Sequence, residues 1–227
     1  MEAKKLRTIG QFARYSIKAL FRDQYNRIRF GPEAPRFSER IWVNPKECVG
    51  CLAGFGDRDS ARVIVSDWPP RGGRLKTFDE NFKIRCCFLH WVQGVPWKET
   101  GIFDFLEEEI RRHPRRCFDD CRNRRDIEER YARLDALFEE IKNSGRLKRQ
   151  REIERWSFRE KGGIFFHLGD CGRLFFGGGG NHRFAMALIL GLARVPAKIG
   201  CVHLRAIPRL RELRKVPQRP TSRVSHE

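Results

Sequence analysis

Apolar residues recur at helical spacing in two stretches of the chain and predict a helix in each. The longer stretch covers residues 126–143 and ends at Gly145, a residue typical of helix C-termini. Its apolar positions are Ile127, Tyr131, Leu134, Leu137, Phe138 and Ile141. The shorter helix is expected over residues 99–112, with Thr100 as the capping residue and Pro114 beyond its end.

Short apolar or alternating runs predict strands around these helices. They cover residues 40–44, 62–65, 163–168, 173–176 and 195–199. The third and fourth runs flank the turn-like residues 169–172 and are therefore expected to form a β-hairpin. Residues 82–92 are a mixed apolar segment with neither clear period. Because helices and strands are both present, we predict the fold class α+β.

The first 30 residues combine helical periodicity with positive charge. Lys and Arg side chains alternate with apolar positions at Leu6, Ile9, Phe12, Ala13, Ile17, Leu20 and Phe21, which predicts a basic amphipathic helix. Two interpretations of its apolar stripe stay open. Either the stripe packs against the rest of the protein, or it lies on a membrane surface.

The most informative segment runs from residue 172 to residue 192. An apolar strand leads into four glycines, Gly177 to Gly180, and then into a helix with Asn181 at the N-cap and His182 and Arg183 in the first turn. Glycine permits positive φ and close approach of backbone N–H groups to a ligand. The unpaired N–H groups of a helix start attract anions. We therefore expect Gly178, Gly179, Gly180, Asn181, His182 and Arg183 to bind phosphate.

A simpler interpretation of the same segment is a tight connection between a strand and a helix, with Asn181 acting only as a cap. The spacing is not that of the two common nucleotide-binding loops. A Walker A loop needs Gly-Lys-Ser/Thr, and a dinucleotide fingerprint needs a third, spaced glycine. If the segment binds a nucleotide, it does so through another kind of loop.

Residues 126–204 resemble the ParB/sulfiredoxin-like domain. The resemblance rests on the run Gly179-Gly180-Asn181-His182-Arg183-Phe184-Ala185, on Leu190-Gly191-Leu192, and on the strand at 195–199. It also rests on the helix at 126–143, which ends in glycine ahead of the two hairpin strands. The resemblance implies a small mixed sheet with flanking helices and a nucleotide-phosphate site.

Members of this superfamily differ in their chemistry. They include CTP-binding partition proteins, the ATP-using reductase sulfiredoxin and a free-serine kinase. Asn181 stands where sulfiredoxin has its reactive cysteine, and about 23 residues follow the core, too few for a helix-turn-helix DNA module. The resemblance thus implies a stand-alone domain that uses a nucleoside triphosphate, ATP or CTP, with or without Mg²⁺, as a phosphotransferase or NTPase acting on a small molecule.

Phosphoryl transfer requires a carboxylate and a proton-handling group in addition to phosphate donors. Asp135, on the edge of the apolar face of the 126–143 helix, is the candidate carboxylate, and His182 is the candidate base. Each has a structural alternative. Asp135 is also suited to pairing with neighbouring arginines on the helix surface, and His182 is also suited to packing on the core.

Composition broadens the set of partners. The chain has 227 residues and a net charge of +18, of which +6 lies in residues 1–30 and +5 in residues 205–227. Besides a nucleotide or phosphorylated small molecule, basic ends suit nucleic acid or an anionic membrane surface. We divide the chain into a basic N-terminal segment (1–30), a core (31–205) and a basic mobile tail (206–227). Neither a signal-peptide pattern nor a membrane-spanning run is evident, so a cytoplasmic location is expected.

Eight cysteines leave two interpretations open. Cys48 and Cys51 have the spacing of a metal knuckle, and Cys86 with Cys87 would complete a four-thiolate zinc site. A second pair with the same spacing is missing from the sequence, however. Reduced cysteines that pack in the interior are the favoured interpretation, and no metal is expected.

Overall fold

The computed structural model describes the backbone of residues 2–217 and the side chains of residues 10 and 12–217. Its helices are α1 (Glu2–Phe30), α2 (Phe82–Trp91), α3 (Ile102–Arg112), α4 (Arg124–Ser144), α5 (Gln150–Ile153), α6 (Asn181–Ile189) and α7 (Leu210–Leu213). Short 3₁₀ turns occupy 45–47, 57–59, 97–99 and 204–209. The protein is thus α+β, as predicted.

Seven strands form one small mixed sheet. They are β1 (Arg40–Val43), β2 (Cys48–Ala53), β3 (Val63–Ile64), β4 (Arg74–Lys76), β5 (Ile164–Leu168), β6 (Leu174–Phe176) and β7 (Val195–His203). The order is β1-β7-β5-β6-β2-β4, and β3 pairs with β7. The β5–β7 and β2–β6 pairs are parallel, whereas β1–β7, β5–β6 and β2–β4 are antiparallel.

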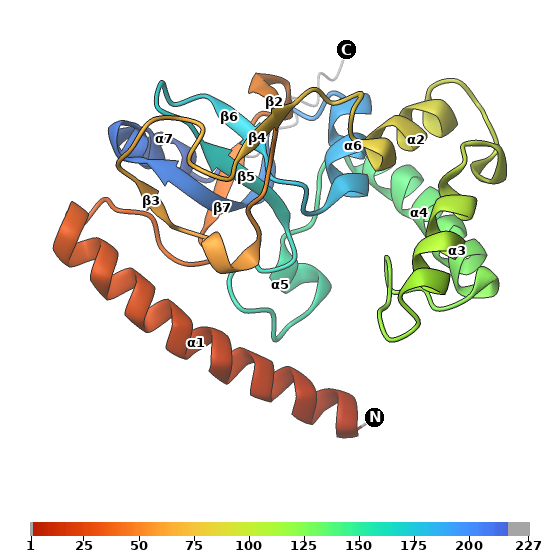
Figure 1. The fold of residues 1–227 in the computed structure, drawn as a ribbon, viewed down its shortest axis with the longest axis horizontal. Coiled ribbons are helices and arrows are strands. Elements are labelled where there is room, and N and C mark those ends of the chain that lie inside the picture. Colours follow the sequence, from red (N-terminus) through yellow and green to blue (C-terminus); the bar gives the residue numbers. More distant parts are fainter. Residues whose placement is uncertain (1, 218–227) are drawn as a thin grey trace, which may run out of the picture.

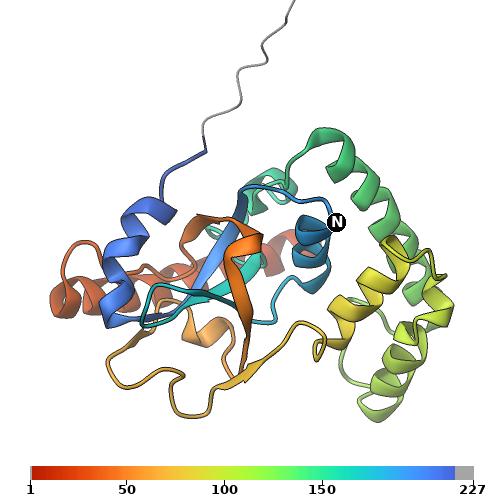
Figure 2. The same cartoon turned by 90° about the horizontal axis from the view of Figure 1, so that it is seen from above.

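The helices lie at different sides of this sheet (Figure 1). Helices α2, α3 and α4 gather at one end of the molecule, and α6 lies between them and the sheet, as both views show (Figures 1 and 2). The core follows this arrangement. It joins the apolar faces of β5, β6 and β7 to α6, and continues through Ile84 of α2 and Ile127 of α4.

Most elements predicted from the periodicity are confirmed. The hairpin forms with Phe166 opposite Phe176, and the long helix ends at Gly145, whose φ of 64° is left-handed. The undecided segment at 82–92 is helical. Asn81 caps it by accepting a hydrogen bond from the backbone N–H of Ile84 at 3.3 Å.

The expectation of a mobile tail from residue 206 is wrong for its first part. Residues 204–213 form a 3₁₀ turn followed by α7, and Ala206, Ile207, Leu210 and Leu213 are buried in the core. Their side chains meet the sheet at helical spacing, which the surrounding arginines and prolines obscured in the sequence. Residues 218–227 lie outside the described residues.

The N-terminal helix is confirmed, but the interpretation in which its apolar stripe packs on the protein is wrong for Ile17, Leu20 and Phe21, while the side chains of Leu6 and Ile9 lie outside the described residues. Ile17, Leu20 and Phe21 are 59%, 59% and 72% exposed. The side of α1 that meets the protein instead carries Ala19 and Asn26, which are 3% and 1% exposed. From Ile17 onward the apolar stripe therefore faces away from the rest of the chain, whereas Phe12 packs against Phe158 with ring centroids 5.6 Å apart.

None of the helices in residues 2–217 combines the length and the apolar character needed to cross a bilayer.

Candidate functional site

The glycine run connects β6 to α6 in a conformation that the sequence favours. Gly178 and Gly180 have φ values of 79° and 76°, which side chains rarely adopt. A Cβ on Gly180 would lie 3.1 Å from the Cα of Ile164, so this part of the turn rests directly on β5. Gly180, not Asn181, is the N-cap of α6, and Asn181 is the first helical residue.

The turn presents a row of unpaired backbone donors. Among the described residues, the N–H groups from Gly178 to Arg183 have no backbone or side-chain acceptor, since α6 begins with the bond from Phe184 N to Gly180 O. On both sides of this row the N–H groups are paired, Gly177 with Phe165 O at 2.6 Å and Phe184 as above. Consecutive unpaired N–H groups at a helix start form a local positive end that suits an anion.

A cleft of about 420 Å³ opens at this turn. Its wall combines the turn and α6 with the carboxyl ends of β2 and β6, with β4, and with the starts of α2 and α3. The lining residues are Cys51, Leu52, Ala53, Gly54, Phe55, Lys76, Glu80, Asn81, Phe82, Lys83, Phe105, Phe176, Gly177, Gly178 and Asn181. The carboxyl edge of parallel strands, followed by a helix N-terminus, is where ligands bind in many α/β sheets.

Two helix starts converge on the cleft. Asn81, the N-cap of α2, donates from its amide to the side-chain oxygen of Asn181 at 3.0 Å. Asn181 in turn donates to the carbonyl of Gly178 at 2.9 Å, which ties the helix to the glycine turn. Because the first residues of both α2 and α6 line the cleft, the positive ends of two helix dipoles lie at the same place.

Behind the cleft, four polar side chains form a buried network. Lys83 donates to both carboxylate oxygens of Asp119 at 2.7 Å. Tyr131 donates to Asp119 at 3.4 Å, and its oxygen lies 3.2 Å from Nε2 of His182. With the tyrosine proton directed to Asp119, Nε2–H of His182 is the donor to Tyr131. The network holds Lys83 beside the cleft and fixes the first turn of α6.

Burial favours the neutral form of His182. Burial lowers the pKa of His182, and the attraction of Asp119 offsets that effect only in part. Burial raises the pKa of Asp119. The charges of Lys83 and His182 lower it by more than burial raises it, so the pKa of this carboxyl lies below its ordinary value. His182 is 7% exposed and its ring packs edge-on against Tyr131 at 5.5 Å. It thus supports the turn from inside.

Arg183 points away from the glycine turn. Its guanidinium donates to the carbonyl of Lys148 and lines a separate hollow of about 330 Å³, together with Arg146, Leu147 and Lys148. Burial lowers its pKa, and the charge of Glu160 opposes this. The structure therefore does not bring the Arg183 side chain together with Gly178 and Asn181, although its backbone N–H belongs to the same row.

Asp135 also lies elsewhere. Its Oδ1 accepts hydrogen bonds from the indole N–H groups of Trp91 and Trp97, both at 3.0 Å, and lies 3.1 Å from Nε2 of His90. These partners occupy its carboxylate, and Asp135 is not among the residues that line the cleft. The carboxylates at the site are Asp119, in the network, and Glu80, in the cleft wall.

The cysteines are free thiols. Burial raises the pKa of Cys48 to about 12 and that of Cys51 to about 11. Within the part of the chain that the structure describes, no three His, Cys, Asp or Glu side chains are grouped to hold a metal ion. Cys51 nevertheless lines the cleft, so its thiol lies within reach of whatever occupies it.

Several residues of the cleft were not predicted from the sequence. Lys76, Asn81 and Lys83 come from the middle of the chain, about 100 residues before the glycine turn. A signal for one of them existed, since Asn81 precedes an apolar segment as N-caps do. Asp119 gave no signal, because it lies in an irregular loop with a φ of 51°.

In comparisons with known proteins, no family model, no curated protein and no solved structure matches this chain.

Proposed function

We propose that the cleft at the glycine turn binds the phosphate groups of a nucleoside triphosphate, and that the protein is a nucleotide-dependent phosphotransferase or NTPase acting on a small molecule. The observation that carries the proposal is the row of unpaired N–H groups from Gly178 to Arg183 at the edge of a cleft. Such a row binds phosphate without side-chain chemistry, because each N–H donates to an anionic oxygen.

Two lysines add charge where the phosphates would lie. Lys76 and Lys83 both line the cleft, from β4 and from the first turn of α2. Lys83 is oriented by Asp119, so its ammonium is preorganised, and a bound phosphate would share it. The Glu80 carboxylate in the same wall is the group best placed to hold Mg²⁺ with a nucleotide, since Mg²⁺ prefers carboxylate and phosphate oxygens.

The rest of the cleft suits a base. Phe55, Phe82 and Phe105 line it, and the rings of Phe82 and Phe105 lie 5.2 Å apart. Aromatic faces stack with nucleobases of every kind, and about 420 Å³ falls within the usual range for small-molecule sites. Because the cleft wall combines charged and polar side chains with aromatic rings, it suits a nucleotide better than inorganic phosphate.

The ParB/sulfiredoxin-like assignment is part of the same proposal. It rests on the resemblance of residues 126–204 and on an arrangement of hairpin, glycine turn, α6 and β7 in the expected order. We assign the role of carboxylate to Glu80 and not to Asp135, since the indole N–H groups occupy the latter. The side chains of His182 and Arg183 take supporting roles, behind and beside the turn.

A binding experiment tests the proposal. Purified protein is titrated with ATP, CTP, GTP and UTP, each with and without Mg²⁺, while its melting temperature is followed at two salt concentrations. A ligand at 100 times its dissociation constant stabilises a fold by about 2.7 kcal/mol. We expect a shift that is selective for one base and only weakly dependent on salt. A shift that appears with any polyanion and vanishes at moderate salt would instead favour nucleic acid as the partner.

Matched variants locate the site. Gly178→Asn keeps the left-handed backbone, which asparagine tolerates, but places a side chain over the N–H row. Lys76→Ala removes a charge from the cleft wall, and Lys98→Ala removes one from an exposed position outside it. The first two variants are expected to weaken nucleotide binding about tenfold or more, the size of one charged hydrogen bond, and the third to leave it unchanged.

A turnover assay distinguishes an enzyme from a protein that only binds the nucleotide. Glu80→Gln is expected to lower phosphate release or phosphoryl transfer far more than it weakens nucleotide binding, because it removes the group that holds Mg²⁺. If the nucleotide binds but is neither hydrolysed nor used with any acceptor, the phosphotransferase part of the proposal fails and the binding part stands.

A further inference from the structure

The outer side of α1 is an exposed apolar face. Ile17, Leu20, Phe21, Tyr25 and Ile28 are 59%, 59%, 72%, 60% and 84% exposed. Leu20 and Phe21 lie three and four residues after Ile17, Tyr25 lies four after Phe21 and Ile28 three after Tyr25, which places the five along one side of the helix. We call these five residues the α1 apolar face. It lies opposite the side that meets the protein, along the free length of the helix (Figure 1).

Polar contacts on the inner side hold this orientation. The buried amide of Asn26 donates to the carbonyls of Pro35 and Ala61 at 2.7 and 2.8 Å. Asp23 accepts a hydrogen bond from the backbone N–H of Phe37 and pairs with Arg159, both at 2.7 Å. Rotating the helix to bury its apolar face would break all of these bonds, so the exposure is built into the fold.

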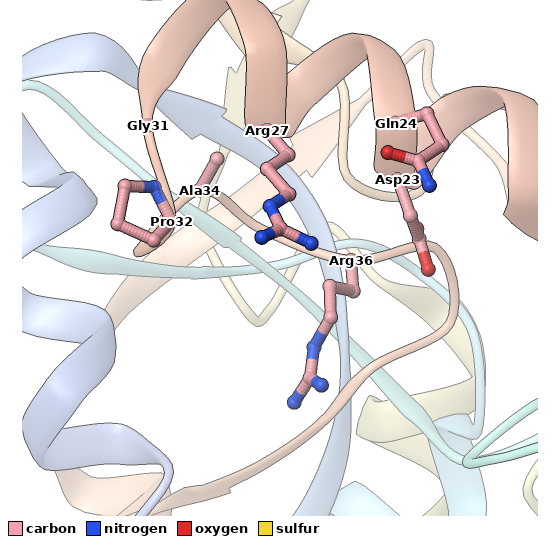
Figure 3. A pocket seen from close by; sticks show the side chains of 7 residues that line it. All are labelled: Asp23, Gln24, Arg27, Gly31, Pro32, Ala34 and Arg36. Carbon is pink, nitrogen blue, oxygen red and sulfur yellow. The ribbon is translucent and has the colours of Figure 1, made fainter.

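Cations border the α1 apolar face. Arg14, Lys18, Arg27 and Arg29 are exposed, and within residues 10–217 none of them has a carboxylate in ion-pair distance. Figure 3 shows Arg27 from α1 and Arg36 from the following loop at one hollow of about 260 Å³, beside Asp23 and Gln24. Residues 1–30 together carry a net charge of +6.

Charge distinguishes among the partners that could cover the α1 apolar face. A second copy of the chain would bring a second +6 helix against the first, and their repulsion opposes pairing. Residues 218–227 offer one large apolar side chain, Val224, against the five of the face. A nucleic acid would satisfy the cations but leave the apolar side chains in water. An anionic bilayer takes up both, since apolar side chains enter the acyl boundary while cations meet headgroup phosphates.

We propose that α1 docks the protein on the surface of an anionic lipid bilayer, lying in the interface with its apolar face inserted. The helix does not span the bilayer. The docking surface is separate from the glycine-turn cleft, since the two share no residue. Membrane binding and nucleotide binding are therefore independent properties, and either can fail without the other.

Vesicle co-sedimentation of the full chain tests this proposal. Vesicles of phosphatidylcholine with and without phosphatidylserine are compared at low and high NaCl. We expect binding to the phosphatidylserine vesicles at least about tenfold stronger than to neutral ones, with a marked loss at high salt. Absence of binding to phosphatidylserine vesicles at low salt would overturn the proposal.

Two sets of variants identify the surface. Phe21→Glu with Ile28→Glu is expected to reduce binding by about tenfold or more, because it places two carboxylates on the inserted face. The matched control, Val65→Glu with Val216→Glu, changes two side chains that are 68% and 64% exposed outside α1 and should reduce binding far less. Equal losses in the two pairs would show that net charge alone acts, and would overturn the insertion of the face.

A second set of variants tests the cations beside the face. It combines Arg14→Gln, Lys18→Gln and Arg29→Gln. The control makes the same change of charge at exposed sites elsewhere, with Arg58→Gln, Arg125→Gln and Arg133→Gln. The α1 set should lose more binding and more of its salt dependence than the control set. Circular dichroism verifies that each variant keeps its helices. Sedimentation velocity tests whether a second copy of the chain covers the face. If the protein is a dimer, and the double variant Phe21→Glu with Ile28→Glu is a monomer, the face belongs to a second copy and the proposal is overturned.

Discussion

Helices α1 and α4 are both amphipathic in sequence, yet the fold uses them in opposite ways. In α4 the periodic apolar positions Ile127, Tyr131 and Leu134 are 0%, 0% and 3% exposed. In α1 the periodic positions Phe21 and Ile28 are 72% and 84% exposed. The first helix completes the core, and the second presents its apolar stripe to the surroundings.

The difference teaches what periodicity can decide. A period of 3.6 residues shows which side chains share a face, but not whether that face turns inward. In α4 the decision follows from its neighbours, since Tyr131 meets Trp97 and Phe103 with ring centroids 4.8 and 5.4 Å away. In α1 the direction of the apolar face follows from two polar residues, Asp23 and Asn26, which form hydrogen bonds with backbone groups of the loops beneath the helix.

A matched pair of tyrosines gives the largest expected effect. Tyr131→Ala should reduce the free energy of unfolding by about 3–5 kcal/mol, because it empties a fully buried site and removes the hydroxyl shared by Asp119 and His182. Tyr25→Ala on α1, where the side chain is 60% exposed, should change it by about 0.5 kcal/mol or less. Urea unfolding measures both. Similar losses in the two variants would contradict the contrast between the helices.

Acid should act on the core and not on α1. Burial lowers the pKa of His167 to about 3, and it lowers that of His182 as well, so both are neutral in the folded protein at pH 7. The unfolded chain takes up protons below its histidine pKa, so stability is fully present above about pH 6.5 and falls as the pH drops toward the folded values. Each histidine contributes a slope of up to about 1.4 kcal/mol per pH unit in that window.

The measurement is urea unfolding between pH 7 and pH 5. His182→Gln should flatten the dependence on pH, while His113→Gln, on the surface, should leave it as it is. An unchanged slope in His182→Gln would mean that the His182 ring takes up its proton in the folded protein as readily as in the unfolded chain.

Much of the fold could be predicted from the sequence, where local signals and packing agree. The hairpin at 164–176 has its turn glycines between two apolar runs, and α4 has a cap, an apolar stripe and a terminal glycine. Short elements were harder. Residues 210–213 gave too few periodic positions to be recognised, and α2 was ambiguous because its buried residues Ile84, Cys86 and Cys87 do not follow the spacing of a single stripe.

The candidate site could be predicted only in its local part. The glycine turn and the start of α6 are adjacent in sequence, and their backbone geometry follows from the residue types. Side-chain directions did not follow. The side chains of His182 and Arg183 leave the turn in different directions, His182 toward Tyr131 and Arg183 toward Lys148, since each first-turn position points about 100° from the next. Lys76 and Lys83 enter from distant segments through sheet pairing and helix packing, which a single sequence does not specify.

Removing the side-chain amide that holds α1 against the protein should lower the free energy of unfolding by an intermediate amount. Asn26→Ala leaves the carbonyls of Pro35 and Ala61 without their donor in a buried place, at a cost of about 1–3 kcal/mol. Gln24→Ala, two residues away on the exposed side of the same helix, should cost far less. Amide hydrogen exchange along residues 10–30 distinguishes local release of α1 from global unfolding. Unaltered protection in Asn26→Ala would mean that other contacts hold the helix.

The smallest expected effect is the most diagnostic for α1. Ile28→Glu should change the free energy of unfolding by about 0.5 kcal/mol or less in the absence of lipid, because the side chain is 84% exposed and already meets water. The same change at Ile127, fully buried in α4, would place an unpaired carboxylate in the core and prevent folding. If Ile28→Glu lowers stability by several kcal/mol, the residue is buried in solution, and a protein surface covers α1 even without a membrane. A near-zero change would mean that the apolar stripe has no protein contacts in solution and is free to insert into a bilayer.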